Sequence, residues 1–164
     1  MKLFKLVAAA ACLLLPTPTF AWDLMPDEIR IPLASRHVNN QNAVNLNETN
    51  PGFALTWEGD WADITAGSLR NSFNNTAAFV TVSRDIWEGE HCRVAGFLGT
   101  AHYPELSQTV TFQHNGWIPI GGIHTECGLF FMQAMPGRGL IGGPSGKAHS
   151  DAILVFGLKM DIGG

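Results

Sequence analysis

Beyond about position 25, the chain is divided into short apolar runs separated by short polar connections, and little of it follows a helical period. β-Branched and aromatic residues fill the runs, and Gly, Asn, Asp and Pro bound them, which is typical of β-strands and turns. We therefore expect an all-β protein. The predicted strands cover residues 28–37, 52–58, 61–71, 76–87, 92–102, 117–125, 128–136 and 151–161.

Alternation of apolar and polar positions is clearest in the second and eighth runs. Phe53, Leu55 and Trp57 share one face of the second run, and residues 154–160 alternate in the same way. The fourth and fifth runs alternate poorly. Both of their faces are therefore expected to be fairly apolar, which suits a barrel whose interior holds side chains or lipid rather than water.

Connection lengths follow a second regularity, because long and short connections take turns along the chain. Bacterial outer-membrane barrels have an even number of antiparallel strands, short periplasmic turns and longer external loops. The sequence therefore predicts an eight-stranded antiparallel up-and-down β-barrel of outer-membrane type, with both termini periplasmic. A secreted soluble barrel or sandwich of lipocalin-like architecture fits the same pattern. The long connections are 39–51, 103–116 and 137–150, and the short ones are 59–60, 88–91 and 126–127.

The first 21 residues have the pattern of a secretory signal peptide. Lys2 and Lys5 precede an apolar stretch at 6–15, and Thr19-Phe20-Ala21 supplies a cleavage site. We expect a signal peptide at 1–21 and a single barrel domain at 22–164; lipidation at Cys12 is the alternative. Later apolar runs are shorter than the roughly 18 residues of a spanning helix, so membrane insertion would require a closed barrel.

Composition narrows the function classes. A chain of 164 residues has room for one domain. Its net charge of −4 makes a nucleic-acid partner improbable. Charged residues make up 15% of the chain, against roughly 25% in soluble domains, which favours the membrane form. Four tryptophans near the predicted strand ends fit either an aromatic girdle or a core: Trp57, Trp61, Trp87 and Trp117.

Cys92 and Cys127 remain after the leader is removed, and in an oxidising compartment they are expected to form a disulfide between the fifth and sixth strands. The alternative is a zinc site that adds His91 and His124 to the two thiols. The disulfide is favoured, and neither a metal ion nor a cofactor is expected.

The external rim contains two candidate catalytic residues. His37 closes the first strand and Ser72 follows the third, so the two strand ends could bring a base to a serine hydroxyl, which is a poor nucleophile without one. In the alternative interpretation, His37 is an ordinary rim residue and Asn71-Ser72 begins a turn. Asn47-Glu48-Thr49 matches a glycan acceptor pattern, here taken as a chance match.

Two early stretches, Asn50 to Trp57 and Leu69 to Asn74, resemble the lipid A palmitoyltransferase family, as do Ile118-Pro119-Ile120, Gly128 to Met135 and Val155 to Met160. The resemblance spans most of the chain after the leader. It implies an outer-membrane barrel that accepts a phospholipid acyl chain in its interior and passes it to lipid A.

Carried over residue by residue, the family's histidine matches His37 and its serine matches Ser72. Its aspartate falls on Asn71, an amide that can donate a hydrogen bond to an oxyanion but carries no charge. The glycine that sets the depth of its acyl pocket falls on Ser83. The expected partners are phospholipid or lipopolysaccharide, and we expect a monomer. The alternative functions are a non-catalytic outer-membrane barrel and a secreted lipid carrier.

Overall fold

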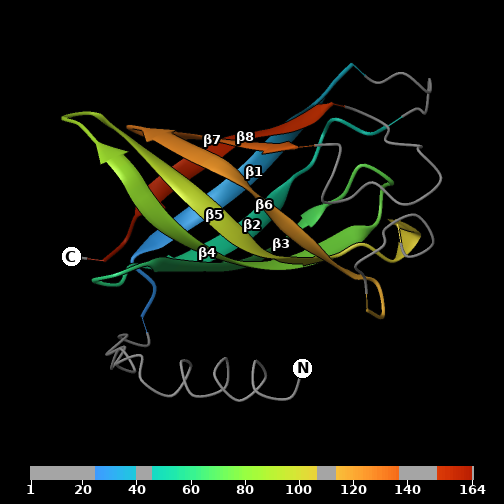
Figure 1. The fold of residues 1–164 in the computed structure, drawn as a ribbon, viewed down its shortest axis with the longest axis horizontal. Coiled ribbons are helices and arrows are strands. Elements are labelled where there is room, and N and C mark those ends of the chain that lie inside the picture. Colours follow the sequence, from blue (N-terminus) through green and yellow to red (C-terminus); the bar gives the residue numbers. More distant parts are fainter. Residues whose placement is uncertain (1–24, 40–45, 107–113, 137–150, 164) are drawn as a thin grey trace, which may run out of the picture.

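A computed structural model describes residues 25–39, 46–106, 114–136 and 151–163. This part of the chain forms one closed barrel in which each strand pairs with the next and β8 pairs with β1 (Figure 1). The predicted eight-stranded antiparallel up-and-down barrel is therefore confirmed. The strands are β1 (Glu28–Val38), β2 (Gly52–Trp57), β3 (Asp63–Arg70), β4 (Thr76–Glu88), β5 (Cys92–His102), β6 (Trp117–Cys127), β7 (Phe130–Pro136) and β8 (Ala152–Asp161).

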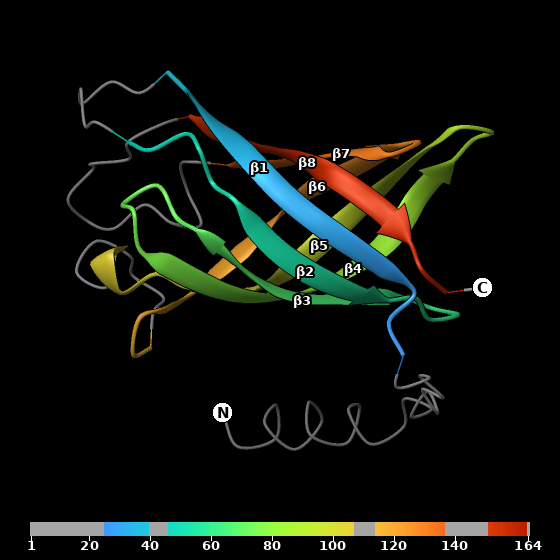
Figure 2. The ribbon, with the colours of Figure 1, turned by 180° about the vertical axis from the view of Figure 1, so that it is seen from behind.

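The connections divide between the two ends of the barrel. One end, here called the turn rim, carries the start of β1, the end of β8 and the short turns after β2, β4 and β6. The other end, the loop rim, carries the connections after β1, β3, β5 and β7 (Figure 2). The predicted signal peptide lies outside the described residues. Within those residues, no helix is both long and apolar enough to cross a bilayer.

One predicted turn is misplaced. Glu126 and Cys127 were expected to form a tight connection, but both belong to β6 and pair with β5, and the turn consists of Gly128 and Leu129. Gly128 has a φ of 57°, a left-handed conformation that glycine adopts without steric cost. The prediction failed because a charged residue looked like a turn residue, whereas the side chain of Glu126 is buried inside the barrel.

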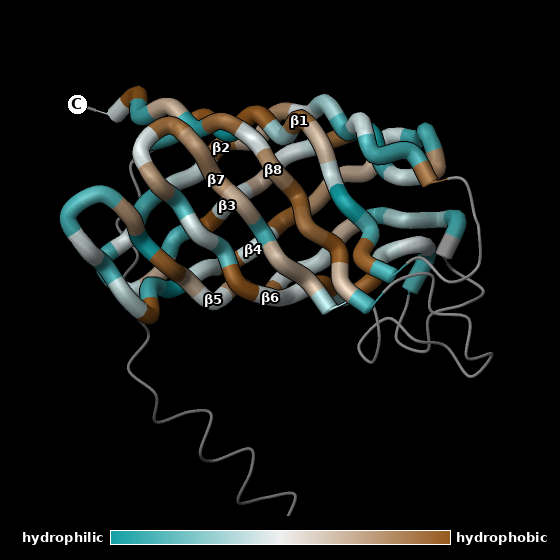
Figure 3. Tube along the Cα trace, turned by 90° about the horizontal axis from the view of Figure 1, so that it is seen from above, coloured by the Kyte–Doolittle hydropathy of each residue, from teal (hydrophilic) through white to brown (hydrophobic). Residues whose placement is uncertain are grey.

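The strands turn apolar side chains outward and mostly polar ones inward. Along β1, Glu28 and Arg30 are buried while Ile31 and Leu33 are exposed. Figure 3 shows the resulting alternation of hydrophobic and hydrophilic residues along the strands. The most exposed outward apolar side chains on the strands include Phe53, Val80, Val82, Ile86, Leu98, Ile123, Phe130, Phe156 and Met160.

Three of the four strand-end tryptophans lie on the surface rather than in a core, and Trp57 is half-buried. Trp61 and Trp87 lie near the turn rim and Trp117 lies at the loop rim. Their side chains are exposed at both ends of the apolar wall, which is the placement that an aromatic girdle requires.

Charged side chains occupy the barrel interior near the turn rim, which corrects the expectation of an apolar interior. Arg30 on β1 donates to Glu126 on β6, and Arg93 on β5 donates to Asp63 on β3. Neither pair of strands is adjacent in the sheet, so these contacts cross the interior. Even β4, which looks apolar on both faces, buries Thr81 and exposes Val82.

The predicted disulfide is present. Cys92 and Cys127 are directly opposite each other in the β5–β6 ladder, with a Cα–Cα distance of 4.2 Å. Because the sulfur atoms are bonded to each other, the alternative zinc site lacks its thiolates. The side chain of His124 lies in the interior instead, beside Glu126.

Candidate functional site

The loop rim brings His37 and Ser72 into contact. His37 lies near the end of β1, 8% exposed, and Ser72 is half-buried in the turn that follows β3. Ser72 Oγ lies 3.1 Å from His37 Nε2, within hydrogen-bond reach. The two strand ends therefore meet at one mouth of the barrel, which places a base beside a serine hydroxyl.

A carboxylate lies on the other side of the imidazole. Glu48 Oε1 is 3.9 Å from His37 Nδ1 and accepts a hydrogen bond from the His37 backbone N–H at 3.1 Å. That hydrogen bond, aided by the Arg36 guanidinium at 3.0 Å from Glu48 Oε2, lowers the pKa of the Glu48 carboxyl. Glu48 is therefore anionic at neutral pH, and its charge lies close enough to stabilise a protonated His37.

The segment that carries Glu48 is bound to the neighbouring strands through its backbone. The Ser35 N–H donates to Glu48 O at 2.8 Å, and the Asn47 N–H donates to Ser72 O at 2.8 Å. Asn50, which is 3% exposed, accepts from Ser35 Oγ and donates to Arg70 O. These bonds tie the segment to β1, β3 and the Ser72 turn, so Glu48, His37 and Ser72 share one framework.

Asn71 shapes the turn that presents Ser72. It is fully buried, and its Oδ1 accepts from the backbone N–H groups of Phe73 at 2.9 Å and Asn75 at 3.0 Å. Asn side chains favour such turns because they mimic a backbone carbonyl. Asn74 completes the turn at a φ of 67°. The turn-forming interpretation of Asn71 therefore has direct structural support.

Glu105 holds the other end of the Asn71 amide. Asn71 Nδ2 lies 3.3 Å from both Glu105 carboxylate oxygens, and Asn75 Nδ2 also donates to Glu105. Partial burial opposes ionisation of Glu105, but hydrogen bonds from its own backbone N–H and from these two amides outweigh it and lower the pKa. An asparagine therefore suits this position, since it can face both backbone donors and a carboxylate.

The interior below the site changes character along the barrel axis. Near the loop rim the buried inward side chains are mainly small or apolar, among them Ala54, Ala77, Ala101, Ile118 and Val155. The charged network follows at the turn rim. Ser83 on β4 is buried beside the charged network and away from His37 and Ser72: its register partners are Asp63 on β3 and Phe97 on β5.

This arrangement can support nucleophilic catalysis by serine. His37 Nε2 can accept the Ser72 hydroxyl proton if the neutral ring carries its own proton on Nδ1, the nitrogen that faces Glu48. Among the described residues, no group of three His, Cys, Asp or Glu side chains is placed to hold a metal ion.

Sequence reasoning selected His37, Ser72, Asn71 and Ser83 as candidates, of which the structure brings His37, Ser72 and Asn71 to one rim, and it did not select Glu48 or Glu105. Glu48 lies in a motif interpreted only as a chance glycan acceptor, and Glu105 lies in a long connection. The sequence distance of Glu48 from His37, and of Glu105 from Asn71, matches no motif, so only the tertiary structure shows that these residues are neighbours. The sequence matches no protein-family model and no curated protein.

Proposed function

We propose that this chain is an outer-membrane β-barrel that transfers or hydrolyses a lipid acyl chain at its loop rim. The observation that carries the proposal is the 3.1 Å contact between Ser72 Oγ and His37 Nε2, beside the anionic Glu48. Similarity of the strand sequences to the lipid A palmitoyltransferase family supports lipopolysaccharide as acceptor and phospholipid as donor.

The apolar outer wall supports membrane insertion over a secreted soluble carrier. Leu98, Phe130 and Ile86 are 67–70% exposed on the outside of the barrel. In water such an exposed apolar wall would promote aggregation, whereas in a bilayer it faces the lipid acyl chains. Closure of the sheet gives each of the eight described strands two neighbours, which supports a monomer.

The proposed reaction has two balanced steps. Ser72 Oγ gives its proton to His37 Nε2 and attacks the ester carbonyl of the donor; as the donor's C–O bond breaks, the departing oxygen takes that proton. A hydroxyl of lipopolysaccharide, or water, then attacks the acyl-Ser72 ester with His37 again as base, and Ser72 regains its proton. The acyl chain would lie among the small apolar side chains near the loop rim and stop at the charged network.

The test begins with fractionation of cells that express the full chain. Recovery in the outer membrane with heat-modifiable migration is expected, and recovery in the soluble periplasm would refute the membrane placement. Mass spectrometry of lipid A and phospholipids then compares the wild type with Ser72→Ala and His37→Ala.

Loss of the His37 base is expected to lower turnover by about 10²–10⁴-fold, the usual contribution of general acid–base chemistry. Loss of the Ser72 nucleophile is expected to abolish formation of the acyl-serine ester. Thr125→Ala removes a hydroxyl near the turn rim and serves as the matched control. Identical lipid profiles in wild type, Ser72→Ala and cells without the gene would refute catalysis and leave the non-catalytic barrel.

A further inference from the structure

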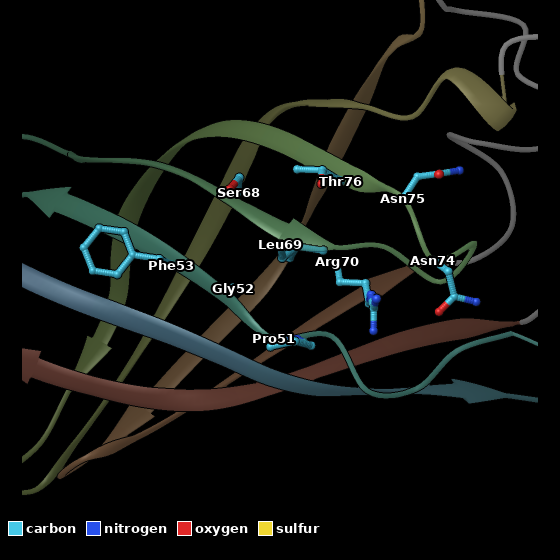
Figure 4. A pocket seen from close by; sticks show the side chains of 9 residues that line it. All are labelled: Pro51, Gly52, Phe53, Ser68, Leu69, Arg70, Asn74, Asn75 and Thr76. Carbon is cyan, nitrogen blue, oxygen red and sulfur yellow. The ribbon is translucent and has the colours of Figure 1, made fainter.

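A groove of about 380 Å³ runs over the outer wall of β2, β3 and the start of β4 at the loop rim (Figure 4). Arg70 lies at its centre, with Asn74 toward the rim and Phe53 at the opposite end. The groove is therefore polar and cationic at the rim and aromatic farther down the wall.

Small outward residues create this hollow. Phe53 on β2, Ser68 on β3 and Ala78 on β4 are paired across the sheet, so a large side chain is followed by two small ones. Nearer the rim Arg70 pairs with Thr76. The hollow is therefore lined by a hydroxyl, an amide and a guanidinium on an otherwise apolar wall.

Arg70 differs from the other basic side chains. Among the described residues, its guanidinium has neither a carboxylate nor an aromatic ring as partner, although it lies beside the turn that carries Ser72. The others all have such partners: Arg30 with Glu28, Arg36 with Glu48, Arg84 over the Trp61 ring, Arg93 with Glu126 and Lys159 with Glu28.

We infer that this groove binds the phosphoester headgroup of an anionic phospholipid. Arg70 supplies the planar donor fork that suits phosphate oxygens, and Ser68 and Thr76 supply hydroxyl donors. The first carbons of the acyl chain that stays outside the barrel then lie along Phe53, while the other chain enters the interior. The inference rests on the membrane placement in the proposed function, but not on catalysis.

The location gives this headgroup site a role in positioning. Arg70 precedes Ser72 by two residues, and its backbone carbonyl accepts from Asn50, which also holds Ser35 on β1. A headgroup held by Arg70 lies outside the barrel wall beside the mouth that contains Ser72. The lipid selected by Arg70 is thus the one whose ester is nearest the nucleophile.

The binding test uses the full chain folded in neutral maltoside micelles. Native mass spectrometry measures bound dioctanoyl phosphatidylglycerol and dioctanoyl phosphatidylcholine from an equimolar mixture. The wild type is expected to favour the anionic lipid by about tenfold, and Arg70→Gln is expected to lose that preference. Ser72→Ala is expected to keep it, so that loss of headgroup binding and loss of acyl transfer are observed separately.

Arg84→Gln is the matched control, because it removes one positive charge from the outer wall toward the turn rim. It is expected to retain the lipid preference. Equal preference in wild type and Arg70→Gln, or an equal loss in Arg84→Gln, would overturn the site. Displacement of the lipid by a molar excess of inorganic phosphate would show a free-phosphate site and would also overturn it.

Discussion

Replacing Glu126 with glutamine tests whether the interior network stabilises the barrel as a balanced set of charges. Glu126 is 2% exposed and receives donors from Arg30, Arg93 at 2.6 Å and Lys159 at 3.0 Å. The buried core of the network contains three carboxylates, on Glu28, Asp63 and Glu126, and three cations, on Arg30, Arg93 and Lys159. His124 also contacts Glu126, and the more exposed Glu58, Asp85 and Asp161 contact Arg93 or Lys159 from outside this core. Removing Glu126 therefore leaves an excess positive charge away from water.

The magnitude follows from the burial of both partners. Removing one member of a buried ion pair costs about 3–5 kcal/mol, because the remaining charge has lost its compensation. Glu126→Gln keeps the side-chain shape, so we assign the loss to charge and not to a cavity. The free energy of unfolding in urea, followed by tryptophan fluorescence of barrels folded into vesicles, is expected to fall by that amount.

Two controls separate charge balance from other effects. Glu90→Gln alters a turn-rim carboxylate that is 88% exposed and is expected to change stability by less than about 0.5 kcal/mol. Arg30→Gln combined with Glu126→Gln restores equal numbers of positive and negative charges, and the double variant is expected to lose at least about 1 kcal/mol less than the sum of the single losses. Wild-type stability in Glu126→Gln, or strict additivity, would refute the reasoning.

Three further predictions concern the loop rim and the disulfide. Asn71→Asp places a carboxylate 3.3 Å from Glu105 and is expected to destabilise the barrel, with Glu105→Gln restoring stability; equal unfolding midpoints for the single and double variants would contradict this. The folded pKa of Glu48 is lowered, so the stability that its carboxylate contributes is complete above the ordinary value of 4.5 and is lost as the pH falls through the lowered pKa. Glu48→Gln should therefore flatten the acid limb of a curve of unfolding free energy against pH. An unchanged limb would disprove the stabilising contact between Glu48 and the His37 backbone. Replacing Cys92 and Cys127 with serine opens a 35-residue loop and is expected to lower the unfolding free energy by about 3–4 kcal/mol. The unfolding free energies of wild type and variant are measured with and without reductant. If reductant also destabilises the variant, its effect on the wild type has an origin other than this disulfide.

The sequence alone determined the strands and their order of connection. Alternation in β2 and β8, together with turn residues between the runs, placed all eight strands close to their observed bounds. The meeting of His37 with Ser72 and of Cys92 with Cys127 also followed, because every second connection of an up-and-down barrel returns to the same rim. These features depend on local propensity and on a period of two, which are readable along the chain.

The tertiary structure decided which polar residues face one another across the barrel. Glu126 looked like part of a turn, because its partners Arg30, Arg93 and Lys159 come from strands distant in the sequence. Glu48 reaches His37 only because residues 47–50 fold back onto β1. Such contacts depend on strand stagger and on the path of the loops, which place side chains in three dimensions without leaving a periodic signal in the sequence.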